Sequence, residues 1–539
     1  MKTTVLSMLA CAIALTWPGA ARASGDLIVD GVTTTIADGV YQTVLVKNGG
    51  VLTVNGNLEA QQVWVLTRGA LNVSSGLHCQ LASIDGTLTV GQNLVCASAV
   101  IVSGTSQISG AANVVDDLSV SGRLIALGGW QLKSLVISAS GVVQVRQNAP
   151  ALPQSGLLRI AANTVRIDNG GVIDAGGAGN DPRGQGHDWY QASDGGGHGG
   201  QGGRGYWNSS AGNEGQAFGS PQTYESFMGG AGGSWGGGGI FIEAEVEFVL
   251  NGSILADGMT GVSAYHGGGG GGGILIRSAQ VTINGLLSAR GGNGVGYSGG
   301  GGGGRIKVFY GNDTMPQFPA WVDVSGGTAG GFLNTQPGQP GTVCRDHIPR
   351  VSSIALPADG AAVANGSIAF RFLVTDLSES PDGHKDALAS LIELSRDGFQ
   401  TIAYTFDQNA DLSGWDRSVY YSGDVVQYTP MVTLAEGVYQ WRVSVRDQSL
   451  YSRPTAPRSL GIGVTPPVPL PLAGICLTPT VVIIGTPGAR CRIDYTDALG
   501  EATVWQPLAT VVVAGGPQLY FDAAAIDKPR RFYRLSYLP

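Results

Sequence analysis

Residues 240–258 read IFIEAEVEFVLNGSILADG, and residues 274–292 read ILIRSAQVTINGLLSARGG. A third copy, LLRIAANTVRIDNGGVIDAGG, occupies residues 157–177. In each copy apolar residues alternate with other residues, an Asn-Gly or Gly-Gly step follows, and a second short apolar segment ends in glycine. Alternating strands turn one apolar face inward, and a single unit cannot bury that face. The copies must therefore stack around a shared core, which predicts a β-solenoid.

The copies recur at a regular spacing. They begin at Ile240, Ile274 and Ile306, at nearly equal intervals, whereas the copy at Leu158 precedes Ile240 by more than twice that interval. The insertion from 187 to 228 accounts for the longer interval. Glycine runs separate the copies and could be read as flexible linkers, because ordered glycine loses much backbone entropy. Linkers do not return in register to an Ile-x-Ile strand, so we favour stacked coils.

A shorter period precedes these copies. Six glycines that each open a segment like G-x-[LV]-x-V recur at nearly equal spacing: Gly50, Gly69, Gly86, Gly104, Gly122 and Gly141. This period predicts coils of about 18 residues, with three faces of about six residues each. Leu52, Leu58 and Trp64 have the spacing of one face and are predicted to occupy equivalent positions on the three faces. The segments do not follow a strict hexapeptide pattern, which favours a right-handed coil.

The N-terminus resembles an export signal. Residues 1–23 contain a lysine at position 2, an apolar run from Val5 to Trp17 and an Ala-Arg-Ala site before Ser24. Cys11 offers a lipoprotein box as an alternative, but the apolar run continues past it. No later segment approaches the roughly 20 apolar residues that span a bilayer. We therefore expect a secreted or cell-surface protein with no membrane-spanning segment after cleavage.

Composition limits the class of protein and its partners. The chain of 539 residues has 87 Gly, 25 Pro and only 13% charged residues, which disfavours helices and predicts a multidomain all-β protein. A net charge of −8 argues against nucleic acid or an anionic membrane as a partner.

Residues 50–345 resemble the parallel β-helix domains of bacterial secreted and surface proteins. Within them the segments SDGGGHGGQGG, GGGGIFIEA, NGSILADG, GGGGGRIKVFY and GTVC follow in the order of a glycine-rich β-helix type, pectate-lyase-like or adhesin-like in character. The resemblance implies an architecture shared by adhesins, surface scaffolds, polysaccharide lyases and glycoside hydrolases, so it does not select one function.

The domains follow from these patterns. We expect a solenoid with coils of about 18 residues at 24–150 and a glycine-rich β-helix at 151–346. Residues 350–464 lose the glycine runs, and Leu434 to Tyr439 followed by Trp441 carry a tyrosine-corner pattern. This segment resembles a fibronectin type III or related immunoglobulin-like sandwich. A proline-rich linker at 465–472 leads to a small C-terminal β module at 473–539.

Six cysteines leave five after signal cleavage. Cys476 and Cys491 flank a strand-like segment and a Gly-Thr-Pro-Gly turn, so we expect a disulfide between them. Cys79 and Cys96 lie one coil apart and could form a bridge between coils or remain buried free thiols. The sequence leaves these two cysteines and Cys344 unassigned.

Aromatic and ionisable residues gather at the glycine runs and in the insertion. Rings that stack on sugars beside groups that bind hydroxyls are what a sugar-binding surface needs, although the same residues can simply cover the solenoid. The candidate ligand-binding residues are Trp189, Tyr190, Arg204, Tyr206, Trp207, Tyr224, Tyr265 and His266.

Catalysis is the alternative use of this surface. His187, Asp188, Asp194 and His198 supply the residue types of an inverting glycosidase or a lyase, but no catalytic signature of either class is matched. We expect no cofactor; GGAGND at 176–181 begins a calcium-binding nonapeptide, but only one copy is present. The sequence therefore favours a non-catalytic protein for adhesion or binding of an extracellular polysaccharide or cell-envelope glycan. A β-helical polysaccharide-degrading enzyme and a structural surface filament are the alternatives.

Overall fold

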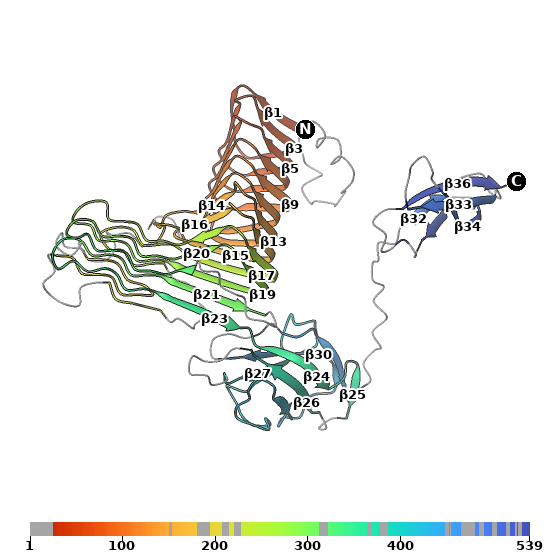
Figure 1. Ribbon diagram of the computed structural model, residues 1–539. Helices are drawn as coiled ribbons and strands as arrows, with labels where there is room; N and C mark the ends of the chain where they lie inside the picture. Colours follow the sequence, from red (N-terminus) through yellow and green to blue (C-terminus); the bar gives the residue numbers. More distant parts are fainter. Residues whose placement is uncertain are drawn as a thin grey trace. The chain divides into compact units, whose positions relative to one another are not determined.

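The computed structural model is all-β, and the residues that it describes contain no α-helix. These are residues 25–149, 154–180, 194–206, 215–219, 228–311, 322–364, 368–377, 386–447, 452, 454–464, 480–483, 490–497, 504–513, 518–522, 525 and 531–538. The chain divides into two compact units, Met1–Pro466 and Pro467–Pro539. The first unit contains a parallel β-helix followed by a β-sandwich (Figure 1).

Two parallel sheets build the β-helix, and each coil contributes one strand to each sheet. The long-strand sheet contains β1 (Asp26–Asp30), β3 (Gly39–Lys47), β5 (Leu58–Val65), β7 (Leu77–Ile84), β9 (Leu94–Val102), β11 (Ala112–Val120), β13 (Gly128–Ile137), β15 (Leu157–Ile167), β17 (Gly239–Leu250), β19 (Gly273–Ile283), β21 (Arg305–Tyr310) and β23 (Thr342–His347). The short-strand sheet contains β2 (Thr33–Ile36), β4 (Val51–Val54), β6 (Ala70–Val73), β8 (Thr87–Val90), β10 (Thr105–Ile108), β12 (Arg123–Ala126), β14 (Val142–Val145), β16 (Val172–Asp174), β18 (Ser253–Leu255), β20 (Leu286–Ser288) and β22 (Val322–Asp323).

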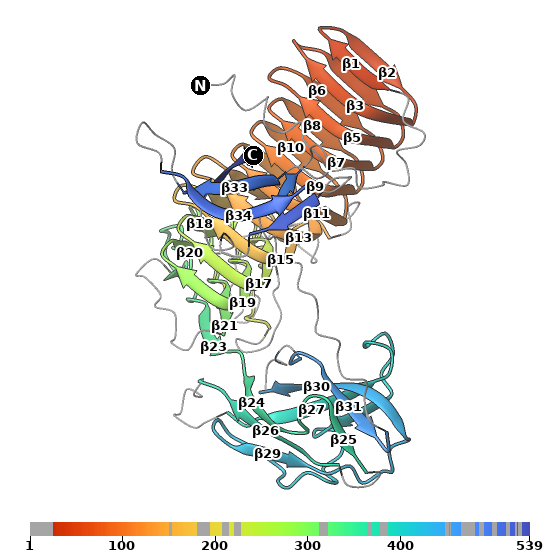
Figure 2. The ribbon, with the colours of Figure 1, turned by 90° about the vertical axis from the view of Figure 1, so that its right-hand side faces the viewer.

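The register confirms both predicted periods. In the short-strand sheet Val51 pairs with Ala70, Ala70 with Thr87, and Thr87 with Thr105, so successive coils are of nearly equal length. Figure 2 shows these coils stacked one on the next from β1 onward. In the later coils the register joins Leu158 to Ile240, Ile240 to Ile274 and Ile274 to Ile306. The long interval before Ile240 therefore interrupts the sequence repeat without interrupting the sheet.

Each coil buries three pairs of side chains. In one coil these pairs are Leu52 with Val54, Leu58 with Ala60, and Val63 with Val65. The inward positions shift by one residue between Ala60 and Val63, so β5 changes direction and supplies two faces. Trp64, predicted to occupy a position equivalent to those of the inward-facing Leu52 and Leu58, falls on the outer side of β5, where its Nε1 donates to Gln62. The prediction is wrong because a strict six-residue step ignores this shift.

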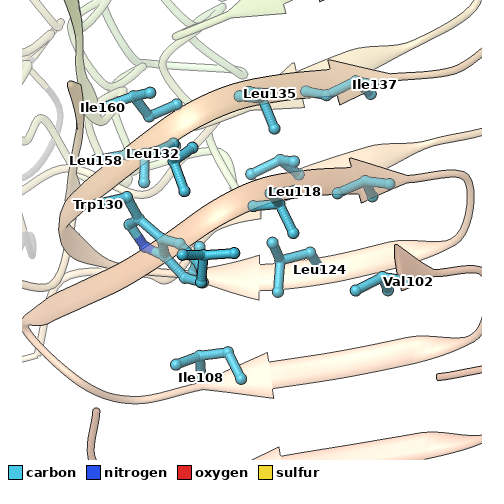
Figure 3. Close-up of a cluster of buried hydrophobic side chains, with 14 of the residues drawn as sticks. Val102, Ile108, Leu118, Leu124, Trp130, Leu132, Leu135, Ile137, Leu158 and Ile160 are labelled. Atoms are coloured by element: carbon cyan, nitrogen blue, oxygen red, sulfur yellow. The ribbon is translucent and has the colours of Figure 1, made fainter. Parts of the chain in front are cut away.

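One continuous core runs through the whole β-helix, from Val29 in β1 to Tyr310 in β21. Figure 3 shows buried side chains from both sheets, among them Leu118, Leu124 and Leu135, directed into one interior. Aliphatic ladders of this kind bury the apolar face that no single coil can cover.

The glycine runs form a separate layer of structure. They project from the side of the β-helix as extended segments that are not β-strands (Figure 1). In residues 267–273, successive backbone amides donate to three different neighbouring segments, and the pattern repeats at every third residue. The acceptors are Gly299 for Gly268, Met259 for Gly269, Gly230 for Gly270, Gly302 for Gly271 and Ala256 for Gly272. A β-strand would alternate between two neighbours, whereas a threefold pattern of directions is the geometry of polyproline II.

Close packing explains the long glycine runs. A Cβ atom at Gly271 would lie 2.2 Å from the carbonyl oxygen of Ala289, and one at Gly302 would lie 2.1 Å from that of Gly200. Only glycine permits backbones to approach this closely from several sides. We call this bundle, built from residues 195–206, 229–238, 256–273, 289–304 and 324–341, the glycine lobe.

A β-sandwich follows the β-helix and has its own core of aromatic and aliphatic residues. One sheet has the order β24 (Arg350–Leu356), β26 (Phe370–Thr375) and β29 (Val425–Tyr428). The other has the order β25 (Ala361–Val363), β31 (Arg458–Ile462), β30 (Gly437–Arg446), β27 (Ala389–Ser395) and β28 (Tyr404–Asp407). The Tyr439 hydroxyl donates to the carbonyl of Ala435 at 2.8 Å, which is the hydrogen bond that a tyrosine corner makes.

The C-terminal unit has two small antiparallel sheets. These are β32 (Thr480–Ile483) with β35 (Gln518–Phe521), and β34 (Gln506–Val512), β33 (Arg490–Thr496) and β36 (Phe532–Leu538). Cys491 on β33 is a free thiol that packs with Ile493 and Val513 in the core of this unit. The structure therefore does not show the predicted disulfide at Cys491, and Cys476 itself lies outside the described residues.

Candidate functional site

Three hairpins of the glycine lobe end in turns that lie side by side. After β18 the chain runs out along residues 256–262, turns at 263–266 and returns along 267–273 to β19. The next hairpin turns at 296–297, and the third turns at 331–334. The peptide N–H of Tyr297 donates to the carbonyl of Ala264, and Gly296 pairs with Gly331 in a parallel bridge. Hydrogen bonds thus align the three turns on successive coils.

Each turn presents one aromatic ring, and the three rings stack. The ring centroids of Tyr265 and Tyr297 are 5.5 Å apart, and those of Tyr297 and Phe332 are 3.9 Å apart. Tyr206 adds a fourth ring at 5.7 Å from Tyr297, tilted against it, and its peptide N–H donates to the Tyr297 carbonyl. We call these four residues the aromatic turn cluster.

The cluster is exposed to solvent. Tyr265 is 52% exposed, Phe332 is 48% exposed and Tyr206 is 41% exposed, whereas Tyr297 lies between its neighbours in the stack. Tyr265 and Phe332 each stack one ring face on Tyr297, and the opposite face of each ring points away from the stack. Leu333, which follows Phe332, is also exposed, so an apolar surface continues beside the stack. Exposed apolar patches of this kind usually mark a binding surface.

The structure brings some of the predicted ligand-binding residues together. Tyr206 and Tyr265 belong to the cluster, and His266 follows Tyr265, with Nδ1 2.8 Å from the Ser263 hydroxyl. Arg204 lies further along the lobe, where its carbonyl accepts a hydrogen bond from the Gln336 amide. The other predicted residues fall outside the described part of the chain: Trp189, Tyr190, Trp207, Tyr224, His187 and Asp188.

Two predicted catalytic residues are buried in the glycine lobe. Asp194 is 4% exposed, and its carboxylate accepts the peptide N–H of Gly205 at 2.6 Å. His198 is 1% exposed, lies 3.0 Å through Nδ1 from the Gly271 carbonyl and stacks on Phe218 with centroids 4.8 Å apart. Burial lowers the pKa of His198 to about 4. In this setting both side chains link segments of the lobe, and neither lies on the aromatic turn cluster.

Sequence reasoning missed Tyr297 and Phe332, half of the cluster. A signal for them exists: when the three repeats are aligned on their glycine runs, one aromatic residue precedes or enters each returning segment, as AYH, GYS and GFL. The isolated Tyr297 and Phe332 have no ionisable neighbour in the sequence, so a search for mixed aromatic and charged clusters passes over them.

We also searched the described residues for metal-binding groups and for membrane-spanning helices. They contain no group of three or more His, Cys, Asp or Glu side chains placed to hold a metal ion. They also contain no helix that is long and apolar enough to cross a membrane. Asp181, the acidic end of the calcium-like GGAGND segment, lies outside the described part.

Comparison with known proteins gives no relative for this chain: no protein-family model, curated protein or solved structure matches it.

Proposed function

We propose that this protein binds an uncharged extracellular glycan through the aromatic turn cluster and serves in adhesion outside the cell or at its surface. The observation that supports the proposal is the row of stacked rings that three successive coils present to solvent, with open faces at Tyr265 and Phe332. Aromatic faces pack against the apolar faces of sugar rings, and nearby hydroxyl and amide groups orient the ligand.

The charge of the turns supports an uncharged ligand. The turn segments 261–266, 294–298 and 329–335 contain no Asp, Glu, Lys or Arg. The chain as a whole has a net charge of −8, so an acidic polymer would be repelled at long range. Binding that rests on ring stacking should depend little on salt, because salt screens charges and not apolar contacts.

Export and accessory domains complete the proposal. Residues 1–23 have the pattern of a cleavable secretion signal, and the glycine-rich β-helix resembles those of bacterial surface proteins. The sandwich at 350–464 would then be a spacer resembling fibronectin type III modules. Residues 473–539 would be a small terminal module for retention or secretion.

The test is retention of the full-length protein on insoluble neutral polysaccharides, such as glucans and chitin. Tyr265→Ala combined with Phe332→Ala should weaken retention. The expected loss of binding free energy is about 1–3 kcal/mol, the range for truncating an aromatic anchor at an interface. Tyr421→Ala is the matched control, because Tyr421 is 45% exposed but belongs to the sandwich. Equal retention of the double variant and the control would refute the proposal, and the release of sugar products would favour an enzyme instead.

A further inference from the structure

A second concave site lies on the β-helix, away from the aromatic turns. It is a groove of about 320 Å³ on the outer face of the long-strand sheet, across β11, β13, β15 and β17. Its lining includes Val114, Gln131, Arg159, Ala161 and Phe241. This volume falls at the lower end of the range for small-molecule sites.

The register explains why the groove exists. One outward row across neighbouring strands reads Ala112, Gly129, Arg159 and Phe241, in direct register. Gly129 has no side chain, so a gap opens between the small Ala112 and the long Arg159. Because neighbouring strands are about 4.8 Å apart, this one missing side chain leaves a space roughly two strands wide.

Arg159 forms the polar wall of the groove. Its guanidinium carbon lies 5.1 Å from the centre of the Phe241 ring, which holds the side chain in place by a cation–π contact. Among the residues that the structure describes, none forms a hydrogen bond or an ion pair with this guanidinium. Its planar fork of N–H donors is thus held beside the gap and remains available to an acceptor.

The neighbouring acid does not cancel this charge. Glu243 also lines the groove, but it accepts a hydrogen bond from Arg277 at 2.5 Å in an ion pair between β17 and β19. With that pair neutralised, Arg159 leaves a local positive charge on a chain whose net charge is −8. The side-chain amide of Gln131, on the adjacent row, adds a donor and an acceptor at the same wall.

We propose that this groove is a second binding site, which takes an oxyanion, a carboxylate or a sulfate ester, carried on a sugar-sized body. Arg159 would bind the oxyanion through two parallel N–H bonds. The apolar floor of Ala112, Gly129 and Ala161 would contact the carbon face of the ligand. This site shares no residue with the aromatic turn cluster, so each of the two binding proposals can be correct without the other.

The experiment titrates the full-length protein with glucuronate, with glucose 6-sulfate and with glucose, and follows ligand signals by saturation-transfer NMR. At least one anion should bind, glucose should not compete with it, and the two anionic probes tell a carboxylate from a sulfate ligand. Binding should weaken when salt is raised from 50 to 500 mM. Arg159→Ala should reduce the affinity at least tenfold, and Arg159→Lys should restore only part of it, because lysine keeps the charge without the fork.

Two further variants make the result specific. Gly129→Leu should fill the groove and abolish binding while leaving Arg159 intact. A Cβ at Gly129 would meet only the Ala111 carbonyl oxygen, at 3.6 Å, so a side chain can leave the backbone there and extend into the groove. Arg166→Ala, on the same strand but paired with Asp168, changes the net charge equally and should have no effect. The proposal is overturned if neither anion binds better than glucose, or if Arg159→Ala binds as well as Arg166→Ala does.

Discussion

Cys79 on β7 and Cys96 on β9 are direct register partners on neighbouring coils, and both thiols are free and buried. Of the two alternatives that the sequence left open, the structure has the pair of buried thiols. The hydrogen bond with Cys96, together with burial, holds the pKa of the Cys79 thiol above its usual range. Only the thiolate reacts with alkylating reagents, so the raised pKa protects Cys79. The same hydrogen bond lowers the pKa of Cys96, whose protection therefore comes from burial in the core.

We therefore expect neither cysteine to react with iodoacetamide at pH 8 in the folded protein. In denaturant both should react completely, and peptide mass mapping would locate the label. Rapid labelling of Cys79 or Cys96 in the native state would contradict the burial described here. A Cys79–Cys96 disulfide in the non-reduced protein would contradict the free thiols.

The two neighbours Val63 and Trp64 test which face of β5 is inward. Val63 is fully buried, so Val63→Thr keeps the shape but buries a hydroxyl, which should destabilise the protein by about 1–3 kcal/mol. Trp64 lies on the outer face, so Trp64→Thr should cost no more than about 1 kcal/mol. Thermal unfolding followed by circular dichroism measures both. A larger loss for Trp64→Thr than for Val63→Thr would place the tryptophan inside the coil.

The outcome at β5 shows how far sequence periodicity reaches. The repeats at Ile240, Ile274 and Ile306 fix which residues stack, because a slip by one residue would turn every apolar side chain outward. The shift between Ala60 and Val63 is different, since it depends on where a strand changes direction. Around this bend the sequence offers apolar residues in both alternation registers, Val63 in one and Trp64 in the other. The local pattern therefore does not determine which of them faces the core.

The glycine lobe and the site show a second limit. Alternating apolar residues identify strands, but polyproline II has no apolar period, and its stability here comes from hydrogen bonds between segments far apart in the sequence. The partners of Gly270 and Gly271 cannot be read from the glycine run itself. Likewise Tyr265 is found beside His266, whereas Phe332 becomes relevant only once the lobe places it against Tyr297.

Steric packing in the lobe gives the next prediction. Gly271→Ala puts a Cβ within 2.2 Å of the Ala289 oxygen and 2.5 Å of the Gly304 nitrogen, and both are backbone atoms that cannot rotate away. We expect a loss of about 1–3 kcal/mol or more, as for overpacked cores, seen as a lower melting temperature. Gly129→Ala is the matched control, since its Cβ meets only one atom, at 3.6 Å, and should be neutral or slightly stabilising. Equal melting temperatures for the two variants would rule out the close packing of the lobe.

The last prediction concerns pH and His198. Burial lowers the folded-state pKa of His198 from 6.5 to about 4, so the imidazole stays neutral in the native protein at a pH where the unfolded chain has already protonated it. The unfolded state therefore binds more protons between these two values, and the stabilisation, complete above pH 6.5, is lost as the pH falls toward 4. A shift of this size corresponds to about 3 kcal/mol. His198→Gln should lower stability at pH 7, because the Gly271 contact and the stacking on Phe218 are altered, but it should remove this part of the pH dependence. Urea denaturation of both proteins at pH 7 and pH 4.5 separates the two effects, because acidic groups elsewhere titrate equally in both. If the wild-type protein and His198→Gln lost the same free energy of unfolding between these pH values, His198 would not be the buried neutral histidine described here.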